Sequence, residues 1–183
     1  TGSFVGDIAV VAVSLCDNSE RNRFGDDFRG IAIYDVSDPA RPQLLSTYDS
    51  GERTQGVHEV DVVTRPDGRV LVAATVMQSY LHTEGAKGDV RLIEITDPTA
   101  PVELSDWDYR AAVLSPDEIL PPGVDEEYHA HSVDFAGGGN RLWAAVWDAG
   151  AVLLDIDDPA TPVVVNSVEA VASAEGNVHS VIS

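Results

Sequence analysis

Basic residues, cysteine and long apolar runs are scarce in this sequence, and each scarcity excludes something. The 183 residues contain 31 acids and 11 bases, which gives a net charge of −20, and Lys87 is the single lysine. A surface this acidic repels phosphate, so nucleic acids and anionic membrane surfaces are disfavoured as partners. Cys16 is the single cysteine, which rules out an internal disulfide. No apolar run reaches the length that crosses a membrane, so we expect no membrane span in this segment.

One stretch of the sequence occurs in three similar copies. Its copies are Gly30–Pro42, Asp89–Pro101 and Gly150–Pro162. Each copy contains an Asp-Pro pair, and these pairs are Asp38 with Pro39, Asp97 with Pro98, and Asp158 with Pro159. The spacings are 97 − 38 = 59 and 158 − 97 = 61 residues. A near-constant period of this size predicts a repeat architecture, and the six Asp and Pro residues form its structural motif.

Each copy is predicted to be a strand that runs into a rigid corner. Apolar residues occupy both alternating faces of the strand, as Ile33 and Tyr34 do in the first copy, so both faces should be covered. In the corner, Asp-Pro-x-x-Pro, the Asp side chain bonds back to its own turn and the first Pro fixes φ. Each strand also carries one acid, at Asp35, Glu94 and Asp155, which we expect to be tied to a backbone donor or an arginine.

The remaining strand patterns complete a four-stranded unit. A histidine-bearing strand and its hairpin partner precede the repeated strand, and an outer strand follows the corner, with no convincing helix between them. Repeated antiparallel meanders that are apolar on both faces pack radially. We therefore predict an all-β fold, a β-propeller fragment of about three four-stranded antiparallel blades plus the start of another. A two-sheet sandwich is the alternative, but its outer faces would alternate with polar residues.

The predicted units follow the repeat. Residues 1–56 are expected to hold the last strands of a partial blade, 57–110 a second blade, 111–127 an irregular insertion, 128–176 a third blade, and 177–183 the first strand of the next blade. The chain lacks an initiator Met and stops as a new repeat begins, so we expect it to be a fragment of a longer protein.

The three copies resemble the LVIVP-repeat proteins of bacteria and archaea. Repeats of that family read Gly-apolar-x-Ile-x-Asp-Val-Ser-x-Pro-x-x-Pro, followed by a strand that opens with His-x-Val. The copies match the first part, and Val57–Val60, His131–Val133 and Val178–Val181 match the second. The second copy departs in having Asp89 in place of Gly and Glu94 in place of Asp. The resemblance implies an exported or cell-surface propeller, and it implies location more than chemistry.

Histidines recur at one position of the repeat. His58, His131 and His179 each stand at the start of a predicted innermost strand, where strand ends of a propeller face the central channel. Neutral imidazoles that converge there can bind Zn, Cu or Fe, and His129 lies on the same strand face as His131. These four histidines are the predicted metal ligands, with a transition metal in the central channel as the candidate cofactor. Two alternatives stay open: a structural bridge between blades through backbone hydrogen bonds, and an acid–base role.

Two further groups of residues are weaker candidates. Asp61 and Asp134 repeat three residues after the histidines, and their carboxylates could orient the imidazoles from outside the set of ligands. Hydrogen bonding between blades is the alternative for both. The acidic loop from Asp17 to Asp27 could hold Ca²⁺ through oxygen ligands, but its spacing fits no EF-hand. A solvated acidic loop is the simpler interpretation.

The predicted function is that of a non-catalytic, cell-surface or secreted β-propeller repeat module that acts as a binding or scaffolding domain. The expected partner is a protein or polysaccharide ligand on the cell surface, and the expected location is extracytoplasmic. The alternative is a metal-dependent propeller enzyme whose channel histidines hold a Lewis-acid or redox metal. The substrate-binding domain of a hydrolase with its catalytic part elsewhere also stays open. The sequence contains no phosphate-binding Gly loop, no Ser nucleophile elbow and no Cys pair.

Overall fold

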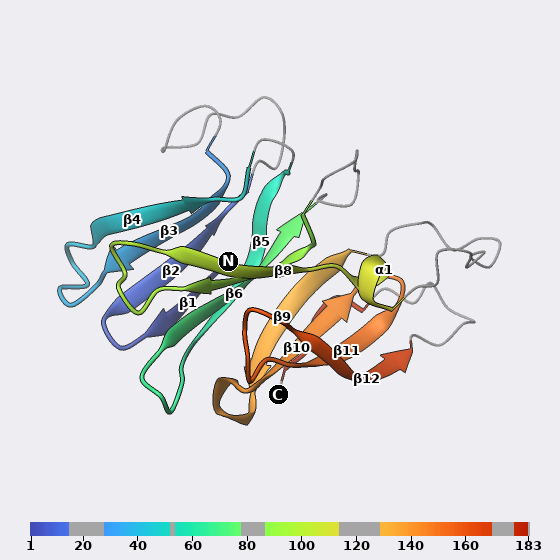
Figure 1. The fold of residues 1–183 in the computed structure, drawn as a ribbon. Helices are drawn as coiled ribbons and strands as arrows, with labels where there is room; N and C mark the ends of the chain where they lie inside the picture. Colours follow the sequence, from blue (N-terminus) through green and yellow to red (C-terminus); the bar gives the residue numbers. More distant parts are fainter. Residues whose placement is uncertain (15–27, 52–53, 78–86, 114–128, 170–177, 183) are drawn as a thin grey trace.

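Antiparallel sheets make up the fold of this chain (Figure 1). The computed structural model describes residues 1–14, 28–51, 54–77, 87–113, 129–169 and 178–182. In these residues, the first sheet contains β1 (Gly2–Val5), β2 (Ile8–Val13), β3 (Gly30–Asp35) and β4 (Gln43–Asp49). The second sheet contains β5 (Gly56–Thr64), β6 (Val70–Met77), β7 (Val90–Glu94) and β8 (Val102–Trp107). The third sheet contains β9 (Ala130–Ala136), β10 (Arg141–Val146), β11 (Gly150–Asp155) and β12 (Val163–Glu169).

Helical structure is confined to two short elements of the described residues. These are α1 (Tyr109–Ala112) and the 3₁₀ turn η1 (Gly137–Gly139). Asp108 caps α1, because its side chain accepts the N–H of Ala111 at 3.1 Å. Neither helix in this part of the chain has the length and apolar character that crossing a bilayer requires. The expected all-β class is confirmed.

The three sheets stand side by side in chain order, as blades do in a propeller (Figure 1). Within each sheet the strands follow one another as a meander, so β1, β5 and β9 each lie at an edge. β5 packs against β1 and β2 of the first sheet, and β9 packs against β5 and β6 of the second. The inner edges of the sheets therefore meet. The predicted β-propeller fragment of four-stranded antiparallel blades is confirmed.

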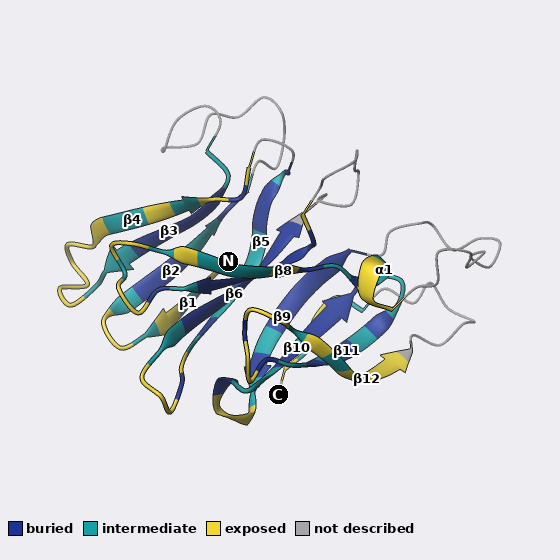
Figure 2. Ribbon diagram, in the orientation of Figure 1, coloured by how far each residue is buried: buried dark blue, intermediate teal, exposed yellow. Residues whose placement is uncertain are grey.

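The hydrophobic core lies between the sheets, where Figure 2 shows buried strands facing one another. Val10 and Ile33 of the first sheet belong to one core with Val72 of β6. Leu71 of β6 belongs to the other core, with Val133 of the third sheet. Neighbouring residues of β6 thus point into different cores, as the two-residue period of a strand requires. Coverage on both faces explains why the strands of the middle sheet are apolar throughout.

The repeated stretch keeps one geometry in all three sheets. It forms β3, β7 and β11, and the pairing with the outer strand shifts register at equivalent points in each sheet. In each corner the Asp carboxylate accepts the backbone N–H two residues on, at 2.9–3.1 Å. The donor and acceptor pairs are Ala40 to Asp38, Thr99 to Asp97, and Ala160 to Asp158. The predicted turn closed by its own Asp is confirmed.

Two features of the fold differ from the sequence pattern. β1 gives the first sheet a fourth strand, whereas residues 1–56 were expected to hold only the last strands of a blade. Four half-exposed residues carry too little pattern to identify a strand, and pairing with β2 orders them.

In the second copy, where Asp89 replaces Gly, Gly88 allows the chain to approach the backbone of the outer strand closely. A Cβ at Gly88 would lie 2.3 Å from the Trp107 carbonyl, much as one at Gly30 would lie 1.9 Å from the Tyr48 carbonyl. The unit boundaries stay a prediction.

Candidate functional site

The two ends of the sheets differ in chemistry. One end, the corner face, carries the three Asp-Pro corners, residues 36–42, 95–101 and 156–162. The opposite end, the histidine face, carries the starts of β5 and β9. β2, β6 and β8 end at this face, and residues 14–29, 78–89 and 108–129 separate them along the chain from the strands that follow. The histidines predicted as ligands lie at the histidine face.

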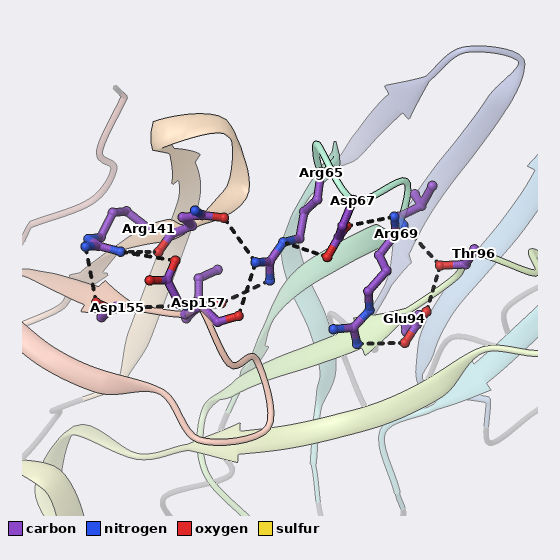
Figure 3. Close-up of polar contacts among 11 residues, drawn as sticks. Arg65, Asp67, Arg69, Glu94, Thr96, Arg141, Asp155 and Asp157 are labelled. Atoms are coloured by element: carbon purple, nitrogen blue, oxygen red, sulfur yellow. Dashed lines mark hydrogen bonds and ion pairs between the residues drawn. The ribbon is translucent and has the colours of Figure 1, made fainter.

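The acids of the repeated strands are held at the corner face, and Figure 3 shows two of them, Glu94 and Asp155. Glu94 pairs with Arg69 at 2.8 Å, and Asp155 pairs with Arg141 at 3.2 Å. Asp35 accepts the backbone N–H two residues on, at 2.8 Å. The hydrogen bond from Arg69 is the main cause that lowers the pKa of Glu94. The predicted ties of these acids to arginine or backbone donors are confirmed.

Arg65 ties the second sheet to the third at the same face (Figure 3). Its guanidinium donates to the carbonyls of Ile156 and Asp157, both at 3.1 Å, and to the Asn140 side chain at 3.0 Å. Arg65 is 8 % exposed. A buried guanidinium is stable only when such acceptors surround it, so this contact fixes how the two sheets meet.

The histidine face gathers imidazoles from successive segments of the repeat. The ring centroids of His58 and His131 lie 4.3 Å apart, and those of His131 and His179 lie 4.1 Å apart. His129 is more distant, 6.5 Å from His131, and stacks on Trp147 at 5.7 Å. The structure therefore brings the three repeat-position histidines together. Their binding of a metal stays a prediction.

Glu59 adds a carboxylate that the sequence analysis did not single out. Donor atoms of His58, Glu59 and His131, one from each, lie within 4.8 Å of one another. In the sequence, the only indication that Glu59 could be a ligand was its position next to His58. Since Ser132 follows His131 in the next repeat, the repeat pattern itself did not mark Glu59.

Burial favours the neutral form of these imidazoles. Desolvation is the main cause that lowers the pKa of His58 and of His131, and the nearby histidines lower both further. Desolvation, and then the proximity of His131, lowers the pKa of His129 to about 4. Neutral imidazole is the form that accepts a proton or binds a metal ion.

His131 also bridges two segments of the chain. Its Nδ1 lies 2.8 Å from the carbonyl oxygen of His179. Because a carbonyl can only accept, Nδ1 carries the proton and Nε2 carries the free lone pair. The N–H of Val178 donates to the Trp147 carbonyl at 2.9 Å and holds the same segment. The bond from His131 is the kind that the structural-bridge alternative requires, and it leaves Nε2 for a ligand.

β-bulges place both inner-strand histidines. In β5, His58 and Glu59 together oppose Thr75 of β6, and in β9, His131 is the extra residue against β10. Bulges redirect side chains and are frequent next to functional sites. Thr75 is fully buried, accepts the Glu59 N–H at 3.0 Å and donates to the His131 carbonyl at 3.1 Å. One hydroxyl thus fixes both segments of the cluster.

Asp61 joins the inner strands of all three sheets. Its carboxylate accepts the Ser3 hydroxyl in β1 at 3.1 Å and the Phe135 N–H in β9 at 2.9 Å. It also accepts the N–H of Val62 at 2.8 Å. These contacts support the alternative of hydrogen bonding between blades for Asp61. Asp134 stands at the equivalent place in β9 and is half-buried, and its role stays a prediction.

Some sequence predictions fall outside the described residues. The acidic loop from Asp17 to Asp27, with its candidate Ca²⁺ site, is one of them. Most of the predicted insertion, residues 111–127, is another.

A comparison with known protein families finds a match in the repeated stretches. The model of the LVIVD repeat matches residues 25–50 and 131–170. These two stretches are similar to LVIVD repeats. The match confirms the family resemblance seen in the sequence, and the first and third copies of the corner motif lie within the matched residues. No curated protein matches the chain.

Solved structures include a match to the extracellular domain of a protein described as a hybrid two-component system from B. thetaiotaomicron. The two chains are 9 % identical, and the match covers 96 % of this chain and 22 % of the other, with a TM-score of 0.31. The chain thus spans less than a quarter of the length of that structure. A TM-score this low carries no argument, so the fold assignment depends on the three sheets and the LVIVD repeats.

Proposed function

We propose that this chain is an extracytoplasmic binding module, in which LVIVD repeats form a rigid frame that presents a ligand-binding surface at the histidine face. The observation that carries the proposal is the gathering of His58, His131, His179 and Trp147 at the inner ends of the sheets. Aromatic rings and imidazoles offer large, stiff contact surfaces, which makes them effective anchors for a ligand.

Repeated ties between the sheets support a scaffolding role. The Ser46 hydroxyl donates to the Pro98 carbonyl, and the Ser105 hydroxyl donates to the Pro159 carbonyl, both at 2.6 Å. The same bond therefore joins the outer strand of one sheet to the corner of the next, while Asp61 joins the inner strands. A surface carried by such a frame is preorganised, which reduces the entropy lost on binding.

The lengths of the connections indicate which face binds. At the corner face the sheets turn within residues 36–42, 95–101 and 156–162, which are equal in length. At the histidine face the equivalent segments between β2 and β3, β6 and β7, and β10 and β11, which are residues 14–29, 78–89 and 147–149, differ in length from one repeat to the next. Loops carried on a rigid scaffold are the usual place for binding residues. Variation at one face only is expected when that face is the one adapted to a ligand.

Charge restricts the chemistry of the partner. With a net charge of −20, the chain repels polyanions and attracts basic surfaces, and it does not repel neutral ones. The proposed ligand is therefore a neutral polysaccharide or a protein with a basic surface.

Binding assays with matched variants of the two faces test this proposal. The wild-type protein would be screened against arrays of neutral glycans and of basic proteins, together with Trp147→Ala and His179→Ala. Asp67→Asn at the corner face serves as the control. We expect the histidine-face variants to lose binding and the control to retain it. Ligands that depend on the corner face, or no ligand at either array, would contradict the proposal.

Location can be tested separately on intact cells of the source organism. Protease added outside should digest the protein while a cytoplasmic marker survives. Protection of the chain until the cells are lysed would contradict an extracytoplasmic location.

A metal-dependent enzyme is the second candidate function, and the convergence of His58, Glu59 and His131 is the observation that favours it. Two histidines and a glutamate leave coordination positions open for water or substrate. Comparison of ester hydrolysis by metal-loaded and chelator-treated protein tests it. Equal rates would exclude a metal-dependent hydrolase for those substrates.

A further inference from the structure

The inner ends of β5 and β9 hold three donor groups in a compact set. Donor atoms of His58, Glu59 and His131 lie within 4.8 Å of one another. His131 is 7 % exposed, whereas His58 and Glu59 are half-buried, so the set is open on one side. Zinc sites place their nitrogen and oxygen ligands about 2 Å from the metal. Donor atoms at this separation therefore need only small side-chain rotations to reach a common ion.

The hydrogen bond of His131 prepares its ring for a metal. Nδ1 donates to the His179 carbonyl at 2.8 Å, which leaves Nε2 unprotonated. Histidines that bind metals usually donate their second ring nitrogen to a carbonyl or carboxylate, because this bond fixes the tautomer and the ring plane. His179 thus takes part through its backbone. Among the described residues no hydrogen bond fixes the tautomer of the His58 ring, so either of its nitrogens can be the one that binds the ion.

The backbone around the donors is built for this convergence. Both histidines stand in β-bulges, which turn their side chains out of the regular alternation of the strands. The buried hydroxyl of Thr75 bonds to the backbone of Glu59 and of His131. It therefore holds the two donor-bearing segments, which come from different sheets, at a fixed separation.

We propose that His58, Glu59 and His131 bind a divalent first-row transition metal ion, with zinc as the ion that this donor set suits best. Two imidazoles and one carboxylate are a known zinc ligand set, and it leaves a fourth position open. The Glu59 carboxylate offsets part of the charge of the ion, and the net charge of −20 raises the local concentration of cations. His129 lies outside the set, since it stacks on Trp147. The site shares His58 and His131 with the proposed binding surface and underlies the second candidate function, but titration with Zn²⁺ alone tests it without any other ligand.

Titration of the metal-free, folded protein with Zn²⁺ alone tests the site. Calorimetry should show a single class of saturable site at physiological ionic strength, and Co²⁺ should give the visible absorption of a low-symmetry nitrogen and oxygen site. We expect His58→Ala, Glu59→Gln and His131→Ala each to weaken Zn²⁺ binding by about tenfold or more. His129→Ala, which removes a neighbouring imidazole, and Asp67→Asn, which removes a distant carboxylate, should bind as the wild type does.

Folding is monitored in parallel, because His131 is buried. Circular dichroism and thermal melting without metal identify any variant that fails to fold. Glu59→Gln keeps the size of the side chain, so it remains informative if His131→Ala unfolds. Two results would overturn the proposal: no saturable Zn²⁺ binding by the folded wild type, or equal binding by Glu59→Gln and His58→Ala. If these variants bound Zn²⁺ as tightly as the wild type does, the ion would be bound by other carboxylates on the surface.

Discussion

At the corner face every sheet ends in the same turn, and acids stand beside arginines, as Glu94 does beside Arg69. At the histidine face the connections differ in length, the inner strands contain bulges, and imidazoles from different segments lie together. Both faces belong to the same repeat. One end therefore carries the contacts that every copy must make, while the other end is free to carry chemistry.

The difference also shows in how polar groups are satisfied. Each corner closes with a hydrogen bond from within its own few residues, and contacts from neighbouring sheets, such as Arg65 to Ile156, are added to this closed turn. At the histidine face the buried groups depend on contacts across sheets, such as Thr75 with His131. Local contacts tolerate changes elsewhere, whereas contacts across sheets require the whole arrangement. The following substitutions test this contrast, from the largest expected effect to the smallest.

Arg65→Ala should cause the largest loss of stability. The substitution leaves the carbonyls of Ile156 and Asp157 without donors in a buried interface. We expect the free energy of unfolding to fall by about 3 kcal/mol, measured by urea denaturation. Arg65→Lys keeps the charge but not the planar guanidinium that donates to several carbonyls at once. Its free energy of unfolding should therefore lie between those of the wild type and Arg65→Ala. A loss below about 1 kcal/mol would show that this interface does not hold the sheets.

Asp61→Ala should be the most damaging change among the inner strands. It removes the acceptor of the Phe135 N–H and of the Ser3 hydroxyl, and we expect a loss of about 2 kcal/mol in unfolding free energy. Ser3→Ala removes one donor and keeps the carboxylate, so it should cost about 1 kcal/mol. Equal losses would mean that the bond to Phe135 contributes nothing.

Thr75→Val sharpens the comparison at the histidine face, because it keeps the shape of the side chain and deletes the hydroxyl. The Glu59 N–H and the His131 carbonyl both lose a partner, and we expect a loss of about 1 kcal/mol in unfolding free energy. Zn²⁺ affinity should fall as well, since the donor-bearing segments are released. Thr47→Val on the exposed side of β4 is the control and should change neither quantity. An unchanged Zn²⁺ affinity in Thr75→Val would separate the hydroxyl from the site.

Glu94→Gln should have the smallest effect, and its effect should depend on pH. The hydrogen bond from Arg69 lowers the pKa of Glu94 in the folded protein, so the stabilisation is complete above the unfolded-state pKa of about 4.5. It is lost as pH falls through the lower folded-state pKa. Because the pair is partly exposed, we expect a difference below about 1 kcal/mol at pH 7 that shrinks below about pH 4. Denaturation at both pH values measures it, and a difference that grows in acid would contradict the assigned direction.

Local chemistry explains what the sequence could predict. The Asp-Pro corner closes its own turn, so each copy carries the same residues in the sequence. The three copies therefore showed the period, the repeated strand before each corner and the outer strand after it. The outer strand expected after each corner is present in the structure, as β4 (Gln43–Asp49) and β8 (Val102–Trp107) show. The convergence of His58 and His131 followed from the repeat alone, since equivalent positions of adjacent blades must lie close together.

Contacts between strands explain what the sequence could not predict. A bulge exists only relative to a partner strand, so the placement of His131 as an extra residue left no trace in the chain itself. Thr75 reads as an ordinary strand residue until β9 is packed against β6. Glu59 was likewise hidden because the repeat does not conserve an acid after the histidine. The missed residues are those whose roles depend on another sheet.

Proton–proton contacts among labelled histidines measure the central arrangement most directly. The chain has five histidines, so a ¹³C-histidine-labelled sample gives a spectrum that single substitutions can assign. With ring centroids at 4.3 Å and 4.1 Å, cross-peaks should join the His58 and His131 rings and the His131 and His179 rings. A folded protein without a cross-peak between His58 and His131 would show that the inner strands do not meet as described.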